Sequence, residues 1–480
     1  MRLLNLCGQI AALVFAIVWC GTCHAADTTR PNVLLIVADD LGYNDVGFQG
    51  GRDIPTPNLD RLAASGTRCT NGYVSYSVCS PSRAGFITGR YQQRFGHEFN
   101  PKWDPTSTQY GLPLSQSTIA DALRGAGYAT GVVGKWHLGA HPQFHPNRRG
   151  FDDFFGFLGG GHRYFPGAHA DVEVGAGKKG APVDDEHASP MMRNGVQEPE
   201  RDELTTRLGE EAAAFVTRRA REPKPWFLYV AFNAPHTPLQ AREDMLQRFA
   251  SITDPRRRTY AAMVATVDEA VGRVLSAVDS AGQRERTLIF FFSDNGGPMT
   301  KRNANASVNT PLRGQKGDVF EGGIRVPFVV SWPGKVPAGK SYDQPVISLD
   351  VFPTALAAAG AKRDAKLPAL DGVDLVPFLT GKAPGAPHAR LFWRMDAGEA
   401  FAVREGNWKW LRSYKNPPEL YNLADDVGES RNVAAQNPEI AQRLAAASAD
   451  WNRELATPVW VNNPFGGIIN RTGPAAAAQP

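Results

Sequence analysis

Apolar runs of strand length alternate with amphipathic stretches along most of the chain. Several runs are apolar on both faces, a pattern typical of strands in a parallel sheet covered by helices. We predict strands at 32–37, 67–76, 129–133, 226–232, 287–292 and 324–332. We predict helices at 58–65, 119–127, 204–221, 259–282 and 351–359. Strands that alternate with helices in this way indicate a doubly wound α/β sheet.

The pattern changes at about residue 391. Two short strands are predicted at 401–404 and 408–411, and a helix follows over 438–455. This order indicates a small α+β domain of antiparallel strands with one packed helix. The predicted division is a large α/β domain at 27–385, the small domain at 386–470 and a disordered tail at 471–480.

The first residues form a separate segment. Arg2 precedes a mostly apolar run at 3–19, and Ala25 and Ala26 offer small residues for cleavage. This is typical of a secretory signal peptide, which we place at 1–26, so the protein is expected to be periplasmic or secreted. The alternative of a membrane anchor is disfavoured because the run is short for a bilayer. Lipid attachment at Cys20 is disfavoured by the bulky residue before it. We expect no stable membrane span in the mature chain.

Composition narrows the functional classes. The 480 residues are 42% hydrophobic and 21% charged, which is ordinary for a soluble domain. The formal charge of +4 gives no reason to expect nucleic acid as a partner, although it leaves room for a local basic pocket. Outside the leader the cysteines are Cys69 and Cys79, so no disulfide framework is expected, and Cys69 should be buried.

Polar side chains follow four of the predicted strands. They are Asp39, Asp40, Lys135, His137, His236, Asp294 and Asn295. Ligands of α/β sheets bind beyond the carboxyl ends of the strands, so these residues should share one site. Adjacent buried carboxylates repel each other unless a cation lies between them. The oxygen-only set of Asp39, Asp40, Asp294 and Asn295 favours Ca²⁺ or Mg²⁺ over zinc.

The stretch Cys79–Arg83 precedes a short predicted helix. Ser80 is suited to the N-cap and Pro81 to the first helical position, while Gly89 should end the helix. Cys79 would then lie at the positive end of the helix dipole, where a thiol can become a reactive nucleophile. The alternative is that Cys79 is a small buried residue before an ordinary helix.

The motif Cys79-Ser80-Pro81-Ser82-Arg83, followed by Ala84 and by Thr88-Gly89, resembles the signature of type I sulfatases. The hexapeptide Gly134–Gly139 resembles a second sulfatase signature, and the resemblance covers most of residues 30–380. It implies an alkaline-phosphatase-like fold, with a mostly parallel sheet flanked by helices. It also implies that Cys79 is converted after translation to formylglycine, an aldehyde whose hydrate attacks sulfur.

The same resemblance implies a role for each reactive residue. It assigns the binding of one Ca²⁺ to Asp39, Asp40, Asp294, Asn295 and the modified Cys79. Arg83 would orient the hydrate, and Lys135 and Lys316 would bind the sulfate oxygens. His236 would protonate the leaving alcohol, and His137 would assist the elimination of sulfate. No further cofactor is expected, and the expected protein partner is the formylglycine-generating enzyme.

The substrate is predicted less sharply. The segments 135–139, 141–146 and 149–152 resemble sulfatases acting on N-acetylgalactosamine-6-sulfate, as in glycosaminoglycan degradation. A sulfated sugar or an aryl sulfate is therefore expected. The residues that could contact the sugar are His97, Glu98, His162, Arg163 and Tyr164, although all five could equally be ordinary loop residues.

Two other functions stay open. A phosphonate or phosphate ester hydrolase of the alkaline phosphatase superfamily would also have a basic pocket, because nearby cations attract phosphate as well as sulfate. A cysteine in place of Ser or Thr, and an oxygen-only metal site, argue against it, but some phosphonate hydrolases share the formylglycine motif. A non-catalytic carbohydrate-binding relative is disfavoured because every expected catalytic position is filled.

Overall fold

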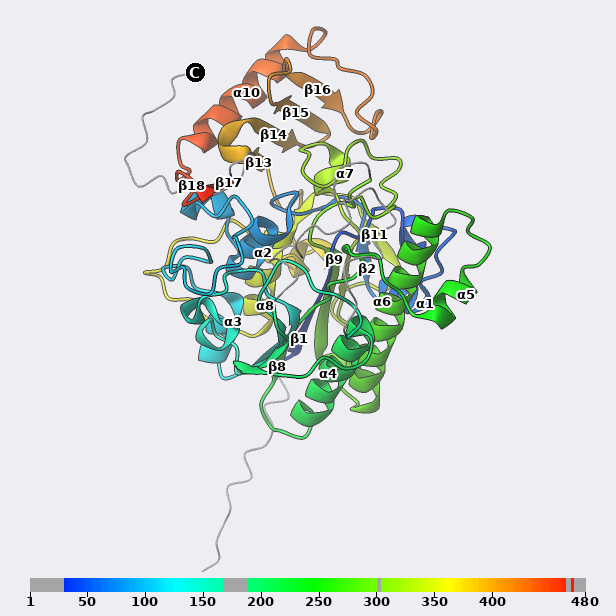
Figure 1. Cartoon of the computed structure of the whole chain (residues 1–480). Coiled ribbons are helices and arrows are strands. Elements are labelled where there is room, and N and C mark those ends of the chain that lie inside the picture. Colours follow the sequence, from blue (N-terminus) through cyan, green and yellow to red (C-terminus); the bar gives the residue numbers. More distant parts are fainter. Residues whose placement is uncertain (1–29, 167–188, 300–303, 463–467, 470–480) are drawn as a thin grey trace, which may run out of the picture.

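A ten-stranded mixed sheet forms the centre of the computed structural model, which describes residues 30–166, 189–299, 304–462 and 468–469 (Figure 1). In spatial order its strands are β11 (Lys340–Tyr342), β2 (Thr67–Cys69), β10 (Phe328–Ser331), β9 (Thr287–Ser293), β1 (Asn32–Ala38), β8 (Trp226–Ala231), β4 (Ala129–Lys135), β5 (Asp153–Phe157), β6 (Met192–Arg193) and β7 (Val196–Gln197). The five central strands from β9 to β5 run parallel, and β10 and β6 pair antiparallel at the two sides. The predicted signal peptide at 1–26 and tail at 471–480 lie outside the described residues.

Helices cover both faces of this sheet, as Figure 1 shows. One face packs against α1 (Pro57–Ala64), α4 (Leu204–Arg219) and α6 (Pro255–Ser280), and the other against α2 (Cys79–Thr88), α3 (Ile119–Gly125) and α8 (Val351–Ala358). In β1, Leu34 and Ile36 enter the first core, while Val33, Leu35 and Val37 enter the second. Alternate side chains of a strand point to opposite faces, so a sheet between two helical layers needs the continuous apolar runs seen in the sequence. The predicted α/β fold is confirmed.

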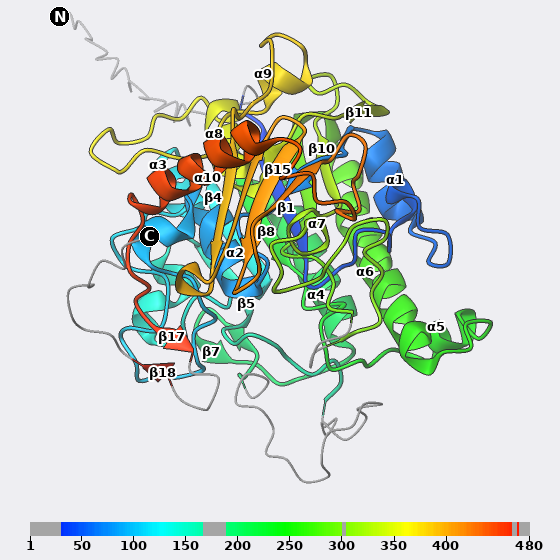
Figure 2. The ribbon, with the colours of Figure 1, turned by 90° about the horizontal axis from the view of Figure 1, so that it is seen from above.

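A second, antiparallel sheet lies near the C-terminus. It contains β13 (Leu391–Met395), β14 (Ala400–Glu405), β15 (Trp408–Ser413) and β16 (Glu419–Asn422), and α10 (Pro438–Asn452) lies across it in Figure 2. Phe401, Trp410 and Leu444 form the core between this sheet and α10. Trp393 on the other face donates a hydrogen bond to the Val74 carbonyl at 2.8 Å. The predicted antiparallel sheet and helix are confirmed, and the domain boundary at residue 386 stays a prediction.

Some short elements differ from the prediction. The predicted strand at 67–76 is broken, because β3 (Gly72–Tyr73) leaves the large sheet and pairs with β12 (Val346–Ile347). The predicted strand at 324–332 is shorter, because a helical turn, α7 (Glu321–Ile324), precedes β10. The remaining elements are α5 (Glu243–Arg248), α9 (Val376–Leu379), β17 (Val461–Asn462) and β18 (Ile468–Ile469). No helix among the described residues is long and apolar enough to span a membrane.

A buried ionic cluster joins the antiparallel sheet to α7, the helical turn before β10. Lys409 of β15 is fully buried, and its Nζ lies 2.9 Å from Glu321 Oε1 and 2.8 Å from Glu429 Oε1. The Glu429 carboxylate also accepts a hydrogen bond from the Glu321 amide at 2.7 Å. Burial raises the pKa of Glu429 to about 7 although Lys409 opposes it. Burial also raises the pKa of Glu321, but Lys409 and Arg325 outweigh this and lower it to about 2.

Replacing Lys409 with Met should therefore lower the free energy of unfolding by about 3–5 kcal/mol at pH 8, because two buried carboxylates lose their shared cation. Without Lys409 the pKa values of both glutamates in the folded protein should rise, that of Glu321 from about 2 and that of Glu429 from about 7. A raised carboxyl pKa stabilises the fold at low pH, and that stability is lost as the pH increases through it. Denaturant unfolding at pH 5 and pH 8 should show a smaller loss at pH 5.

Lys415→Met is the matched control, because Lys415 is exposed in the loop between β15 and β16. A K409M variant no less stable than K415M, or equally destabilised at both pH values, would contradict the cluster's role.

Candidate active site

The carboxyl ends of the parallel strands bring the predicted acidic residues together. Asp39 and Asp40 follow β1, Asp294 follows β9, and all three are fully buried. The Asp40 amide donates to Asp294 Oδ1 at 3.3 Å, and the Asp294 amide donates to the Ala38 carbonyl at 3.0 Å. Asn295 Nδ2 donates to Asp40 Oδ1 at 2.6 Å. The four residues therefore share one edge of the sheet, as the strand-end pattern predicts.

Cys79 opens α2 and points into the same cluster. Its Sγ lies 3.5 Å from Asp39 Oδ1 and 3.1 Å from Lys316 Nζ. The helix ends at Gly89, whose φ of 66° is the left-handed cap expected of glycine. The N-cap prediction was wrong: Val78 occupies that position, and the Ser80 hydroxyl contacts the His137 carbonyl instead.

The thiol of Cys79 is not activated in this environment. Burial and the negative charge of Asp39 raise its pKa, and Lys135 and Lys316 do not compensate. A thiolate is the nucleophilic form of cysteine, and desolvation disfavours it. Without a bound cation, these surroundings therefore favour the protonated thiol of Cys79 over the thiolate.

Two cations lie on the acidic cluster from the α2 side. Arg83 donates from Nε and Nη2 to Asp294 Oδ2 at 3.0 and 2.7 Å, and Lys135 Nζ donates to Asp39 Oδ2 at 2.5 Å. Arg83 Nη1 also donates to the hydroxyl of Tyr229, a residue of β8, at 3.0 Å. Tyr229 was missed because it lies within a continuous apolar run that indicates core packing.

Lys316 and His236 both contact the cluster at Asp40. Lys316 Nζ lies 2.8 Å from Asp40 Oδ1, and His236 Nε2 lies 3.7 Å from Asp40 Oδ2. Burial lowers the pKa of His236 to about 4 although Asp40 opposes it, so the imidazole is neutral at pH 7. The two side chains come from loops far apart in the sequence and meet at one carboxylate.

His137 reaches the site through an unusual backbone. β4 extends to Lys135, two residues beyond the predicted strand, and His137 then has a φ of 57°. Burial, together with the positive charges of Lys135 and Arg83, lowers the pKa of His137 well below its usual value. His137 is thus a buried neutral imidazole in the field of these cations.

The donor set fits a hard divalent cation. One ligand atom from each of Asp39, Asp40, Cys79 and Asp294 lies within 4.8 Å of the others. Asn295 Oδ1 is buried without a hydrogen-bond partner among the described residues. Burial and the charge of Asp39 raise the pKa of Asp294 to about 6, the repulsion that a cation would relieve. Carboxylate and amide oxygens are the ligands that Ca²⁺ and Mg²⁺ prefer.

Asn305 also supports the site and was missed by the sequence analysis. Its side-chain amide donates to the carbonyls of Asp40 and Pro235 at 3.1 and 3.2 Å. It thereby ties the loop after β1 to the loop that carries His236. No motif surrounds Asn305, so only the three-dimensional contacts reveal this role.

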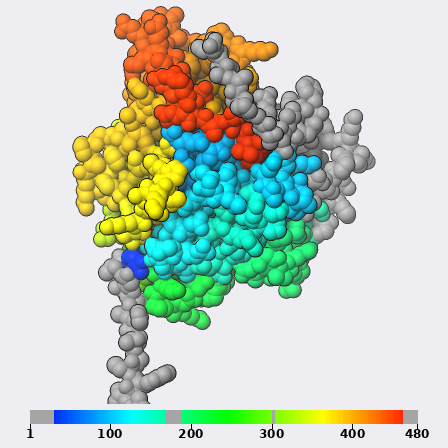
Figure 3. Space-filling model, turned by 90° about the vertical axis from the view of Figure 1, so that its left-hand side faces the viewer, coloured from blue at the N-terminus to red at the C-terminus, as the bar shows by residue number. Residues whose placement is uncertain are grey.

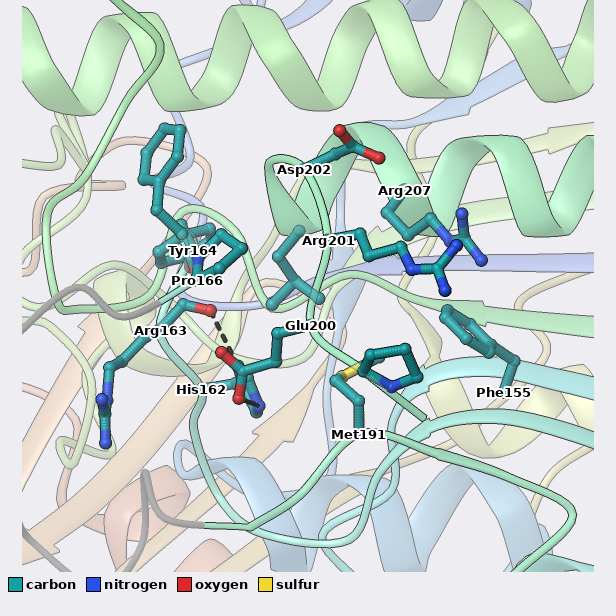
Figure 4. Close-up of a pocket in the computed structure, with 13 residues that line it drawn as sticks. Phe155, His162, Arg163, Tyr164, Pro166, Met191, Glu200, Arg201, Asp202 and Arg207 are labelled. Carbon is teal, nitrogen blue, oxygen red and sulfur yellow. Dashed lines mark hydrogen bonds and ion pairs between the residues drawn. The ribbon is translucent and has the colours of Figure 1, made fainter. Parts of the chain in front are cut away.

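A pocket lies beside the His236 loop, and Figure 4 shows side chains that line it. Three of the predicted sugar-contacting residues are there: His162, Arg163 and Tyr164. The Tyr164 hydroxyl donates to the His236 carbonyl at 2.8 Å, so the pocket adjoins the reactive cluster. His97 and Glu98 do not line this pocket, and they are fully buried rather than exposed loop residues.

Comparison with known proteins identifies the family. The sulfatase family model matches residues 31–361, and the model of the C-terminal region of N-sulphoglucosamine sulphohydrolase matches residues 315–451. Arylsulfatase A of Bos taurus is 35% identical over 465 residues, which cover 88% of this chain and 87% of the relative. N-acetylgalactosamine-6-sulfatase of Mus musculus is 32% identical over 440 residues, which cover 89% of this chain and 81% of the relative.

Solved structures agree with this relationship. The crystal structure of Ps i-CgsB in complex with k-i-k-neocarrahexaose has a TM-score of 0.83 at 39% identity, and the match covers 91% of this chain and 96% of that one. The phosphonate monoester hydrolase of Agrobacterium radiobacter shares the fold, with a TM-score of 0.64 at 24% identity. The fold is thus the alkaline-phosphatase-like arrangement that the sequence predicts. The chain belongs to the sulfatase family, whose members hydrolyse sulfate esters.

Proposed function

We propose that this protein is a formylglycine-dependent sulfatase that binds one Ca²⁺ and removes sulfate from a sulfated sugar. The observation that carries the proposal is the buried cluster around residue 79, which contains every predicted reactive residue. Arg83, Lys135 and Lys316 face Asp39, Asp40 and Asp294 there, beside Cys79 and two neutral histidines.

Residue 79 is proposed to act as formylglycine rather than as cysteine. Its thiol is held protonated, so the unmodified side chain is a poor nucleophile. The hydrated aldehyde would supply an oxygen nucleophile, and its second hydroxyl allows the sulfate ester to be expelled without attack by a separate water. Asp39 and Lys316 contact the side chain of residue 79 and would orient the modified group.

The cations would stabilise the sulfuryl group. Lys135 and Lys316 are proposed to bind sulfate oxygens, and Arg83 is proposed to orient the group at residue 79. Bound Ca²⁺, held by Asp39, Asp40, Asp294 and Asn295, would polarise the sulfate ester and lower the charge repulsion around it. In the structure each of the three cations is paired with a carboxylate of the cluster.

His236 is proposed to protonate the leaving alcohol through Nε2. Its Nδ1 lies 2.6 Å from the Thr237 carbonyl, and a carbonyl oxygen can only accept, so Nδ1 carries the hydrogen. The proton that is transferred must therefore sit on Nε2. A bound sulfate ester is negatively charged and would raise the low pKa of His236. His137 is proposed to take the proton that accompanies sulfate elimination.

The proposed substrate is a sugar of the N-acetylgalactosamine-6-sulfate type, with aryl sulfates as simpler substrates. The segments 135–139 and 141–146 and the named relatives support this choice, and the pocket of His162, Arg163 and Tyr164 lies beside His236. A phosphonate or phosphate ester hydrolase is not favoured, because the likeness to the phosphonate hydrolase extends to the fold alone. We also propose export through the signal peptide at 1–26, and maturation by a formylglycine-generating enzyme.

Cys79→Ala should abolish sulfatase activity, with a loss of about 10⁴-fold or more, because the nucleophile is removed. The wild-type protein co-expressed with a formylglycine-generating enzyme should show an aldehyde at residue 79 by peptide mass spectrometry. Cys69→Ala is the matched control, since Cys69 is the other buried cysteine of the described chain. A fully active wild type that retains the Cys79 thiol would contradict the proposal.

Asn295→Ala should weaken Ca²⁺ binding by about tenfold or more, because it removes an oxygen ligand. After treatment with a chelator, adding Ca²⁺ should raise the melting temperature of the wild type, since a ligand that binds only the folded state stabilises it. Titration of that shift measures the affinity. Asn416→Ala, at an exposed position, should bind Ca²⁺ like the wild type. If N295A binds Ca²⁺ with the same affinity as the wild type, Asn295 is not a ligand of the metal site.

The kcat/KM of the wild type for 4-nitrophenyl sulfate should be at least about 10²-fold higher than its kcat/KM for 4-nitrophenyl phosphate or for phenyl phosphonates. A screen of sulfated mono- and disaccharides should then give its highest rate on a 6-sulfated N-acetylgalactosamine. A preference for the phosphonate would instead favour the alternative function.

A further inference from the structure

The Ser80 hydroxyl lies between two histidines in the fold. Its Oγ is 2.6 Å from the His137 carbonyl oxygen and 2.7 Å from His97 Nε2. Ser80 and His97 are fully buried, and His137 is nearly so. His97 does not line the pocket where its predicted sugar contact would be made, but it touches Ser80, the neighbour of residue 79 in the chain.

The chemistry of the three groups fixes the direction of both hydrogen bonds. A carbonyl oxygen can only accept, so the single hydroxyl hydrogen of Ser80 goes to His137. The Ser80 oxygen must then accept a hydrogen from His97 Nε2. His97 is therefore the tautomer with its hydrogen on Nε2. If the Ser80 hydroxyl donated to His97 instead, its oxygen and the His137 carbonyl oxygen would lie 2.6 Å apart with no hydrogen between them.

This chain of bonds ends at a strained backbone. His137 has a φ of 57°, a left-handed conformation that costs a residue with a side chain roughly 1–2 kcal/mol. Such a conformation persists when the surroundings fix it. The His137 amide donates to the Leu158 carbonyl at 3.2 Å, and its carbonyl accepts from Ser80. The backbone amide and the backbone carbonyl of His137 are thus both held by hydrogen bonds, and this fixes the direction in which its imidazole points.

His97 is itself held by the C-terminal segment. The ring of Trp460 packs edge to face on His97 with centroids 4.8 Å apart, and the Val459 amide donates to the Gly96 carbonyl at 2.9 Å. Figure 3 shows this red segment lying against the blue part of the chain. Glu98 is paired with Arg394. Burial, together with the positive charge of Arg149, lowers the pKa of His97 to about 3 although the Gly111 backbone opposes this, so it stays neutral.

We propose that His97 is a positioning residue of the sulfatase reaction, which holds Ser80 on the His137 carbonyl and so aims the His137 imidazole at residue 79. The proposal rests on the function proposed above for His137. His97 touches neither substrate nor the reacting atoms, and it acts through one donated hydrogen bond. A substitution that keeps a hydrogen-bond donor at the position of His97 Nε2 should therefore preserve activity.

The test compares His97→Gln, which keeps a donor, with His97→Met, which removes it. H97M should lower kcat on 4-nitrophenyl sulfate by about 10²-fold, the cost of a small displacement of a reacting group, with KM nearly unchanged. H97Q should stay within about threefold of the wild type. The formylglycine content and melting temperature of each variant are measured alongside, because a loss of maturation or folding would mimic the effect.

A double-mutant cycle with Ser80→Ala tests the coupling. The variant H97M/S80A should be no slower than S80A, because both changes break the same chain of bonds. If H97M does not fold, S80A and Ser80→Thr, corrected for formylglycine content, decide the case: S80T should keep kcat and S80A should lose it. His388→Met is the matched control, since it removes a partly buried histidine, one paired with Asp350 at 2.8 Å, and should lower stability but not kcat.

Other outcomes separate this proposal from the proposed function. Equal kcat values for H97M and H97Q, or additive effects of H97M and S80A, would overturn the positioning role. If His137→Ala is inactive while H97M behaves as wild type, only the role of His97 fails. If H137A is as active as the wild type, both the proposed role of His137 and the positioning role of His97 fail.

Discussion

Three carboxylates buried together at one edge of the sheet are the constraint on which the site depends. Removing Asp39, Asp40 and Asp294 from water costs several kcal/mol for each ion unless opposite charges offset it. The chain offsets this with Arg83 from α2, Lys135 from β4 and Lys316 from the loop before α7. Those elements must meet at one point. The order β9, β1, β8, β4 meets this requirement because the parallel strands end at the same edge.

The same electrostatics bear on the proposed conversion of Cys79 to formylglycine. Burial in a cluster rich in carboxylates raises the pKa of the Cys79 thiol, even at a helix N-terminus and beside Lys316. Without a bound cation, this cluster therefore disfavours a thiolate at residue 79. An oxygen nucleophile that forms without deprotonating a thiol suits this environment better. Charge balance and the identity of the nucleophile are thus linked through the same carboxylates.

The sequence predicted the parts of the fold that depend on local pattern. The long apolar runs gave β1, β4, β8 and β9, and the polar residues that follow them meet in space as expected. The short strands β5, β6, β7 and β11 were not predicted, because they have few residues and little alternation. Tyr229 and Asn305 were missed because their roles come from contacts across 146 and 265 residues of sequence. Ser80 was assigned to a helix cap because its tertiary partner cannot be seen locally.

The C-terminal sheet reaches the site from two directions, which indicates that it supports the site. Lys409 pairs with Glu321, five residues after Lys316, and the Gly317 amide donates to the Ser77 carbonyl just before Cys79. On the other side, Arg394 pairs with Glu98 and Trp460 packs on His97. The first route ends five residues from Lys316, and the second ends on His97, which contacts Ser80 beside Cys79. Loops positioned only by their own residues would leave such side chains mobile, because loops carry few buried contacts. The second sheet therefore supplies rigidity that the strand ends alone do not provide.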